Sequence, residues 1–149
     1  MKKKAVLLVL ILVAAVSLFP YNTKLEEKLF YSLGHFGAAF LYQTYLNIGM
    51  ISDIWTHNIY SPEDAKSLLN TNLSFLKSSK KNMQELTEFS ITNEDRGTFM
   101  EMLSIIDDLT GEADNMLKYI SSRAQPDIDQ YELHRKQAWA KITKLMDIK

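Results

Sequence analysis

The stretch from Leu29 to Pro62 restricts the fold of this 149-residue chain more than any other feature. It is rich in aromatic and aliphatic residues, and Asp53 is its only formally charged side chain. A helix that is apolar on nearly every side must be covered by other elements. Because three charge-rich amphipathic segments follow, the pattern predicts one mostly buried helix wrapped by three others. A membrane span here is disfavoured, since Gln43, Asn47 and Asp53 would be costly to insert.

The N-terminus has the pattern of an export signal. Three lysines at positions 2–4 precede the uncharged run Ala5–Phe19, and Ala15 and Ser17 supply small residues for cleavage after residue 17. Fifteen helical residues reach only about 22 Å, short of the roughly 30 Å hydrocarbon core. An uncleaved anchor extending to about residue 21 is the alternative. Either way, we expect residues 22–149 to be exported to the periplasm or the exterior, free or anchored to the inner membrane.

Composition narrows the class of protein further. The chain has no cysteine, which excludes disulfides and thiolate metal sites. Without the three N-terminal lysines, 14 of the 17 basic residues remain against 18 acidic ones, a balance of -4. No basic stripe remains, so we expect no nucleic-acid binding. Contact with a membrane is expected only through the N-terminal segment.

Helical periodicity and boundary signals divide the rest of the chain into four segments. The expected helices cover residues from about 23 to 59, 61 to 88, 93 to 120, and 126 onward. Ser61 is a helix N-cap followed by Pro62 in the first turn, and Thr92 or Asn93 can cap the third helix. The connections are short, so consecutive helices should be antiparallel neighbours. The expected fold class is all-α: an antiparallel up-down-up-down four-helix bundle preceded by an N-terminal signal or anchor helix.

Polar residues interrupt the apolar stripes of three of these helices: Asn47 on the first, Asn72 on the second and Arg135 on the fourth. Counted from the connections, they lie at a similar height, roughly 14–18 Å along each helix. A buried arginine needs a charged partner, so Asp114 or Asp53 should pair with Arg135. The structural interpretation is a polar layer that fixes helix register. The functional interpretation is the floor of a small ligand pocket.

The third segment has an acidic face, made of Glu101, Asp107, Asp108, Glu112 and Asp114. A run of this kind is usually solvated, and we interpret it in that way. Asp107 and Asp108 are adjacent and point about 100° apart, so they do not form a catalytic carboxylate pair. The chain also lacks a cysteine nucleophile, a G-x-S-x-G or H-E-x-x-H motif and a glycine-rich phosphate loop. We therefore expect no enzymatic activity.

The three histidines, His35, His57 and His134, bear on metal and haem binding. They stand at different heights, and none has the Glu-x-x-His spacing of di-iron bundles. Met50 and His134 lie at comparable heights, which would suit axial haem ligation. An exported bundle with such ligands resembles the four-helix haem cytochromes in architecture and in two residue types, but not in a motif. The sequence thus predicts no metal and no cofactor, with haem on Met50 and His134 as the alternative.

Together these features predict an exported, non-catalytic helical bundle. It would act as an interaction or binding module in the cell envelope or outside the cell, with an unidentified protein or small molecule as its partner. The alternative function is a small-molecule or cofactor carrier that uses the polar region between the helices.

Overall fold

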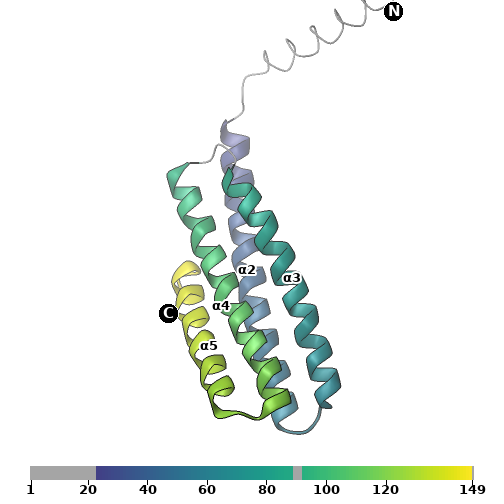
Figure 1. The fold of residues 1–149 in the computed structure, drawn as a ribbon. Helices are drawn as coiled ribbons and strands as arrows, with labels where there is room; N and C mark the ends of the chain where they lie inside the picture. Colours follow the sequence, from purple (N-terminus) through teal and green to yellow (C-terminus); the bar gives the residue numbers. More distant parts are fainter. Residues whose placement is uncertain (1–22, 89–91, 149) are drawn as a thin grey trace, which may run out of the picture. The chain divides into compact units, whose positions relative to one another are not determined.

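A computed structural model describes residues 23–88 and 92–148, with side chains from residue 28 onward. These residues form four α-helices that contact one another: α2 (Thr23–Thr56), α3 (Pro62–Glu88), α4 (Asn93–Ser122) and α5 (Gln125–Leu145) (Figure 1). The expected signal peptide or anchor falls on residues 1–22, outside the described part. In residues 23–88 and 92–148, none of the helices has the length and hydropathy needed to cross a bilayer.

The chain divides into two compact units between Ser32 and Leu33, and α2 passes from one into the other. In the first unit, the described residues 23–32 are helical. The packing of the four helices described below belongs to the second unit, residues 33–149.

Local capping chemistry sets several helix boundaries. The Ser61 hydroxyl accepts a hydrogen bond from the Asp64 backbone N–H at 3.1 Å, and Thr92 accepts from the Asp95 N–H at 3.1 Å. Both confirm the expected N-caps. The first helix ends at Thr56, three residues before the expected end, because Asn58 adopts a left-handed φ of 59° that a helix cannot contain.

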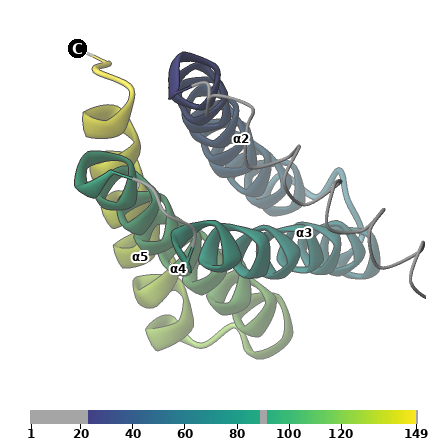
Figure 2. The ribbon, with the colours of Figure 1, turned by 90° about the horizontal axis from the view of Figure 1, so that it is seen from above.

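Among the four helices, α4 buries the most side chains. In the ribbon of Figure 2 it lies between α3 and α5. It packs against both α3 and α5, and its Tyr119 ring meets Trp55 of α2 edge-on at 5.9 Å. The side chains that α4 buries come from nearly every turn: Phe99, Met102, Leu103, Ile105, Ile106, Asp108, Leu109, Glu112, Ala113, Met116 and Ile120. Because it buries more side chains than α2, α4 takes the central place expected for α2.

In contrast, part of α2 is exposed, although this helix also contacts α3, α4 and α5. Leu41, Ile48 and Trp55 are buried at helical spacing, whereas Leu33 and Phe36 are 42% and 75% exposed. The expectation of a rod hidden on nearly all sides is therefore wrong for this part of α2. Lack of charge on a helix surface does not by itself bring a neighbour to that surface.

The order of the contacts shows how neighbouring helices run. Going forward along α4, Glu101, Asp108 and Glu112 meet Lys144, Lys141 and Arg135, which go backward along α5. Likewise, the space beside Gly37 of α2 is taken by Met83 of α3, and Asn47 bonds to Asn72. Each of these pairs of helices therefore runs in opposite directions, as the ribbon of Figure 1 also shows.

Candidate functional site

A buried ion pair joins α4 to α5. Arg135 donates from its Nη1 to Glu112 Oε1 at 2.7 Å, and its guanidinium lies 4.5 Å from the centre of the Tyr45 ring of α2. The guanidinium also fills the space beside Gly49, where an added Cβ would come within 2.4 Å of it. Three helices thus converge on this one arginine.

Glu112 is a buried carboxyl whose surroundings are unfavourable for its charged form. Its side chain is fully buried, and its second oxygen, Oε2, has no hydrogen-bond partner. Burial raises the pKa of the Glu112 carboxyl to about 7, although the hydrogen bond and charge of Arg135 act in the opposite direction. Oε1 of this carboxylate is paired with Arg135, whereas Oε2 has lost its contact with water without gaining a hydrogen bond, which is unfavourable for the charged form.

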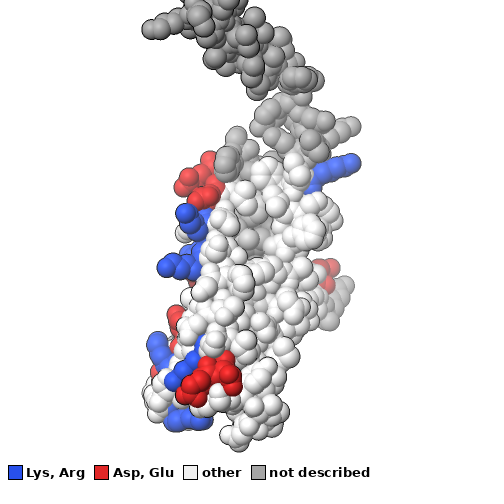
Figure 3. Space-filling view, turned by 90° about the vertical axis from the view of Figure 1, so that its right-hand side faces the viewer, with Lys and Arg blue, Asp and Glu red and all other residues white. Residues whose placement is uncertain are grey.

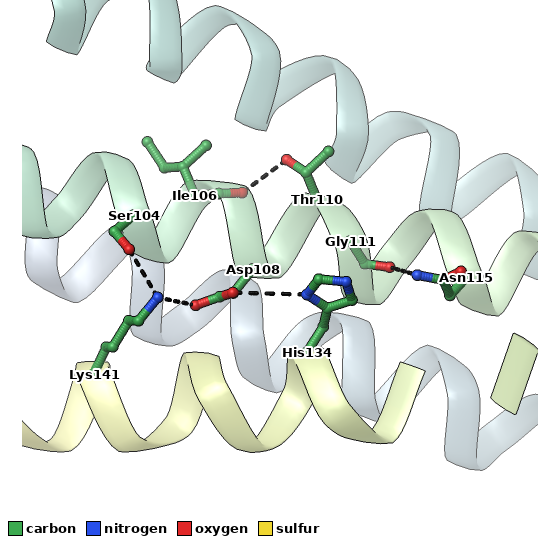
Figure 4. Close-up of polar contacts among 8 residues, drawn as sticks. All are labelled: Ser104, Ile106, Asp108, Thr110, Gly111, Asn115, His134 and Lys141. Carbon is green, nitrogen blue, oxygen red and sulfur yellow. Dashed lines mark hydrogen bonds and ion pairs between the residues drawn. The ribbon is translucent and has the colours of Figure 1, made fainter. Parts of the chain in front are cut away.

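A second polar cluster lies beside the first on the same two helices (Figure 4). Lys141 of α5 donates to Asp108 Oδ2 at 2.5 Å and to the Ser104 hydroxyl at 2.7 Å. On its other side, Asp108 Oδ1 lies 3.6 Å from His134 Nδ1. The His134 ring packs over Gly111, where an added Cβ would fall 2.6 Å from Nε2. Asp108 is thereby enclosed between two basic side chains of α5.

The Ser104–Lys141 contact resembles a hydrolase dyad only in its residue types. A dyad lysine must accept a proton from the serine, whereas Lys141 is the cationic partner of Asp108. Ser104 also sits within the continuous helix α4, where backbone N–H groups bond to the preceding turn and do not form an oxyanion hole. The arrangement can hold α4 and α5 in register, but it lacks the parts of a nucleophilic site.

The expected polar layer is assembled only in part. Asn47 Nδ2 donates to Asn72 Oδ1 at 3.2 Å, and Asn72 Nδ2 donates to the Leu68 carbonyl at 2.9 Å. The two asparagines therefore meet as expected, on α2 and α3. Arg135 lies on the other side of α2, beside Gly49, and is bonded to α4.

The acidic partner of Arg135 is neither Asp114 nor Asp53, which corrects the expected pairing. Both of these side chains are exposed. Asp114 is two residues beyond Glu112, so it points roughly 200° away around α4. Asp53 lies four residues, about one turn, beyond Gly49 on α2, but its side chain is exposed while the guanidinium is bonded to Glu112.

The alternative of haem binding required Met50 and His134 as axial ligands. Met50 is 52% exposed on α2, while the His134 ring is packed against Gly111 of α4 and faces Asp108. Both nitrogens of the imidazole are therefore next to protein atoms. Among the described residues, no group of three or more His, Cys, Asp or Glu side chains is arranged to hold a metal ion.

The acidic face expected on α4 is not uniformly solvated. Asp107 and Asp114 are exposed, but Asp108 and Glu112 are buried, and both were missed as site residues. The burial of Glu112 could have been predicted from its position in the sequence. Glu112 falls three residues after Leu109 and four before Met116, within the apolar series that faces inward.

A second feature is an uncharged surface shared by α2 and α3 (Figure 3). Phe36 lies 11 residues before Asn47, close to three full turns, so it is on the side of α2 that faces α3. Phe75 lies three residues after Asn72 and is on the corresponding side of α3. Phe36 and Phe75 are 75% and 60% exposed.

We call this surface the α2–α3 face. It consists of exposed apolar side chains and their uncharged, exposed neighbours: Leu33, Phe36, Leu68, Phe75, Thr71, Ser78 and Asn82. In Figure 3, Lys, Arg, Asp and Glu gather mainly along one edge and the lower end of this view, while the area between them is free of charge.

Comparison with known proteins adds no family assignment. Neither a family model, nor a curated protein, nor a solved structure matches this chain. The functional conclusion must therefore come from the geometry of the described residues.

Proposed function

We propose that this protein is an exported, non-catalytic helical bundle that acts as an interaction module through its α2–α3 face. The exposure of Phe36 and Phe75 on this uncharged face carries the proposal. Their side chains, with those of Leu33 and Leu68, present on the order of 400 Å² of apolar surface to solvent. Aromatic side chains are enriched in protein-binding surfaces.

The charged clusters support a structural role rather than a catalytic one. Two ion pairs cross the α4–α5 interface: Lys141 of α5 pairs with Asp108 of α4, and Arg135 of α5 pairs with Glu112 of α4. Their charges are used within the fold. Exposed apolar side chains occur on all four helices, among them Met100 on α4 and Leu133 on α5, and the exposed phenylalanines of the described residues, Phe36 and Phe75, belong to the α2–α3 face.

The carrier alternative receives less support from the same contacts. Asn47 and Asn72 bond to each other, and Arg135 fills the space beside Gly49 and binds Glu112. Asn47 Nδ2, both side-chain polar atoms of Asn72 and Arg135 Nη1 are thus engaged by protein groups. We therefore do not adopt a carrier function, and haem on Met50 and His134 is not part of the proposal.

The proposed architecture is an up-down-up-down bundle whose N-terminal segment directs export and is either removed or retained as an anchor. The basic residues at positions 2–4 and the apolar run Ala5–Phe19 support it. The intact mass of the protein isolated from envelope and culture fractions of its own host tests this part. A chain beginning at Leu18 indicates cleavage, and a full-length chain in the membrane fraction indicates an anchor. Recovery of the full-length chain from the cytoplasm would contradict export.

The interaction proposal is tested by co-purification of the tagged full-length chain from its own host. We compare the wild type with Phe36→Asp/Phe75→Asp, with Leu133→Asp on the exposed side of α5, and with Ser104→Ala in the polar cluster. The proposal predicts that a stoichiometric protein partner, a second copy included, is lost only from the double variant. It is contradicted if the partner is equally retained by all four proteins, or if Leu133→Asp or Ser104→Ala releases it.

A further inference from the structure

We propose that the partner of the α2–α3 face is a second copy of this chain, in a two-fold symmetric dimer. This inference rests on the proposed function and specifies its partner. In such a dimer, the same patch is used on both copies, so each residue faces an identical surface.

The charge distribution suits pairing of the face with itself. A two-fold interface brings like patches together, and a charged patch would therefore repel its own copy. On α3, Lys66, Lys77 and Lys81 lie roughly 120–180° around the helix from Asn72, away from the α2–α3 face. Lys80 points toward α4, where it binds Asp107. The residues that border Phe75 on the outer side are Thr71, Ser78 and Asn82, which carry no charge.

The exposed apolar area is about half of the surface that a standard dimer interface covers on each partner, and uncharged polar neighbours would supply the rest. The four exposed apolar side chains present on the order of 400 Å² per copy, and the uncharged neighbours surround them with polar surface. A standard interface buries about 800 Å² per partner, with an apolar centre and a polar rim. The α2–α3 face has this composition, with Phe36 and Phe75 as the large central anchors.

A lipid surface fits the same face less well. Helices that lie on membranes carry lysine and arginine beside their apolar residues, which attract anionic headgroups. The rim of the α2–α3 face has serine, threonine and asparagine in those positions instead. The absence of basic residues in this rim favours protein over lipid. Acidic residues lie on the same stripe of α3 only toward its two ends, at Asp64 and Glu85, so the centre that a second copy would cover is uncharged.

Sedimentation equilibrium of the protein in the form that its host accumulates tests the proposal. We expect the wild type to be a dimer at micromolar concentration and Phe36→Glu/Phe75→Glu to raise the dimer Kd by about 100-fold or more, because like charges then face each other. The matched control Leu133→Glu should leave the Kd unchanged. Circular dichroism should show the same helicity for all three, since each substituted side chain is exposed.

Cross-linking supplies a second, independent readout. The chain has no cysteine, so single cysteines can be introduced without background. Ser78→Cys at the α2–α3 face should give a covalent dimer with a short bismaleimide, and Ser121→Cys at the exposed end of α4 should not. Equal yields at the two positions would contradict a dimer through this face.

The outcomes separate this inference from the proposed function. A monomeric wild type without a Ser78→Cys cross-link overturns the dimer. If Phe36→Asp/Phe75→Asp still loses a different protein in the co-purification, the interaction module stands and only the identity of its partner is wrong. A monomer that binds anionic vesicles through Phe36 and Phe75 overturns the dimer in favour of a lipid surface. If neither a copy, a protein nor a vesicle depends on these residues, both proposals fail.

Discussion

At the scale of single residues, Glu112 determines how the α4–α5 interface responds to pH. Its carboxyl has no solvent exposure and one oxygen without a hydrogen bond, so the charged form is poorly tolerated despite Arg135. A pKa of about 7 in the folded state compares with an ordinary value of 4.5. The folded state therefore holds a proton that the unfolded chain releases between these two values.

This difference gives a stability prediction with a definite sign. The favourable contribution of protonated Glu112 is complete below about pH 4.5 and is lost as the pH rises to about 7. Across that window, this group should lower the free energy of unfolding by about 3 kcal/mol. Urea denaturation from pH 4.5 to 8 should show that Glu112→Gln removes this part of the slope. Identical slopes for the variant and the wild type would show that the carboxyl is solvated.

Removal of Arg135 should be costly when Glu112 is charged. Arg135→Ala leaves a buried carboxylate without its only hydrogen-bonded cation, a change that typically costs about 3–5 kcal/mol. Denaturation at pH 8 measures this cost, which should be smaller at pH 5, where Glu112 is protonated. In a Glu112→Gln background the same substitution should cost less, because the pair is already absent. A cost that does not depend on pH or background would place the role of Arg135 in its packing on Tyr45 alone.

The residues of this cluster were only partly accessible to sequence reasoning. Asn47, Asn72 and Arg135 stood out as polar residues on apolar stripes, and the two asparagines do meet. The partner of Arg135 was missed because Glu112 was assigned to an acidic face with Asp114. Charge counts treat these two residues alike, whereas helical geometry places them on nearly opposite sides of α4.

At the scale of helices, the close approach of α5 to α4 depends on Gly111 of α4, because glycine has no side chain to meet the His134 ring. Gly111 has the His134 ring in the place of a Cβ, while the space beside Gly97 of the same helix is open for at least 4 Å. Two glycines of α4 thus have different reasons to be present. Only Gly111 is required by packing.

These two positions form a matched pair for mutagenesis. Gly97→Ala should stabilise the protein by about 0.5–1 kcal/mol through helix propensity. Gly111→Ala should destabilise it by about 1–3 kcal/mol, because the His134 ring must move. Thermal denaturation checks both, and His134→Ala should reduce the cost of Gly111→Ala. A gain in stability from Gly111→Ala would show that α5 can shift without cost.

The existence and limits of the helices followed from the sequence better than their arrangement did. Ser61 and Thr92 cap helices through side-chain oxygens, which is a local effect that a sequence pattern captures. Which helix would be central was predicted incorrectly. The uncharged surface of α2 was taken as a sign of burial, but α4 buries side chains in nearly every turn while part of α2 stays exposed at Leu33 and Phe36.

At the scale of the whole molecule, paired charges link α4 to α5, and the exposed phenylalanines of the described residues lie on α2 and α3. Basic side chains of α5 pair with acids of α4, and the α2–α3 face presents aromatic side chains without charge. Sequence reasoning could predict an all-α helical bundle. It could not locate the exposed face, because the same apolar residues suit a core and a binding surface equally well.

Photo-cross-linking inside the host cell measures most directly whether the α2–α3 face is the working surface. A photoreactive phenylalanine analogue replaces Phe75 on this face in one strain and Leu133 on α5 in another. The proposed function predicts a discrete covalent adduct from position 75 and none from position 133. An adduct from position 133 alone, or none from either position, would contradict it.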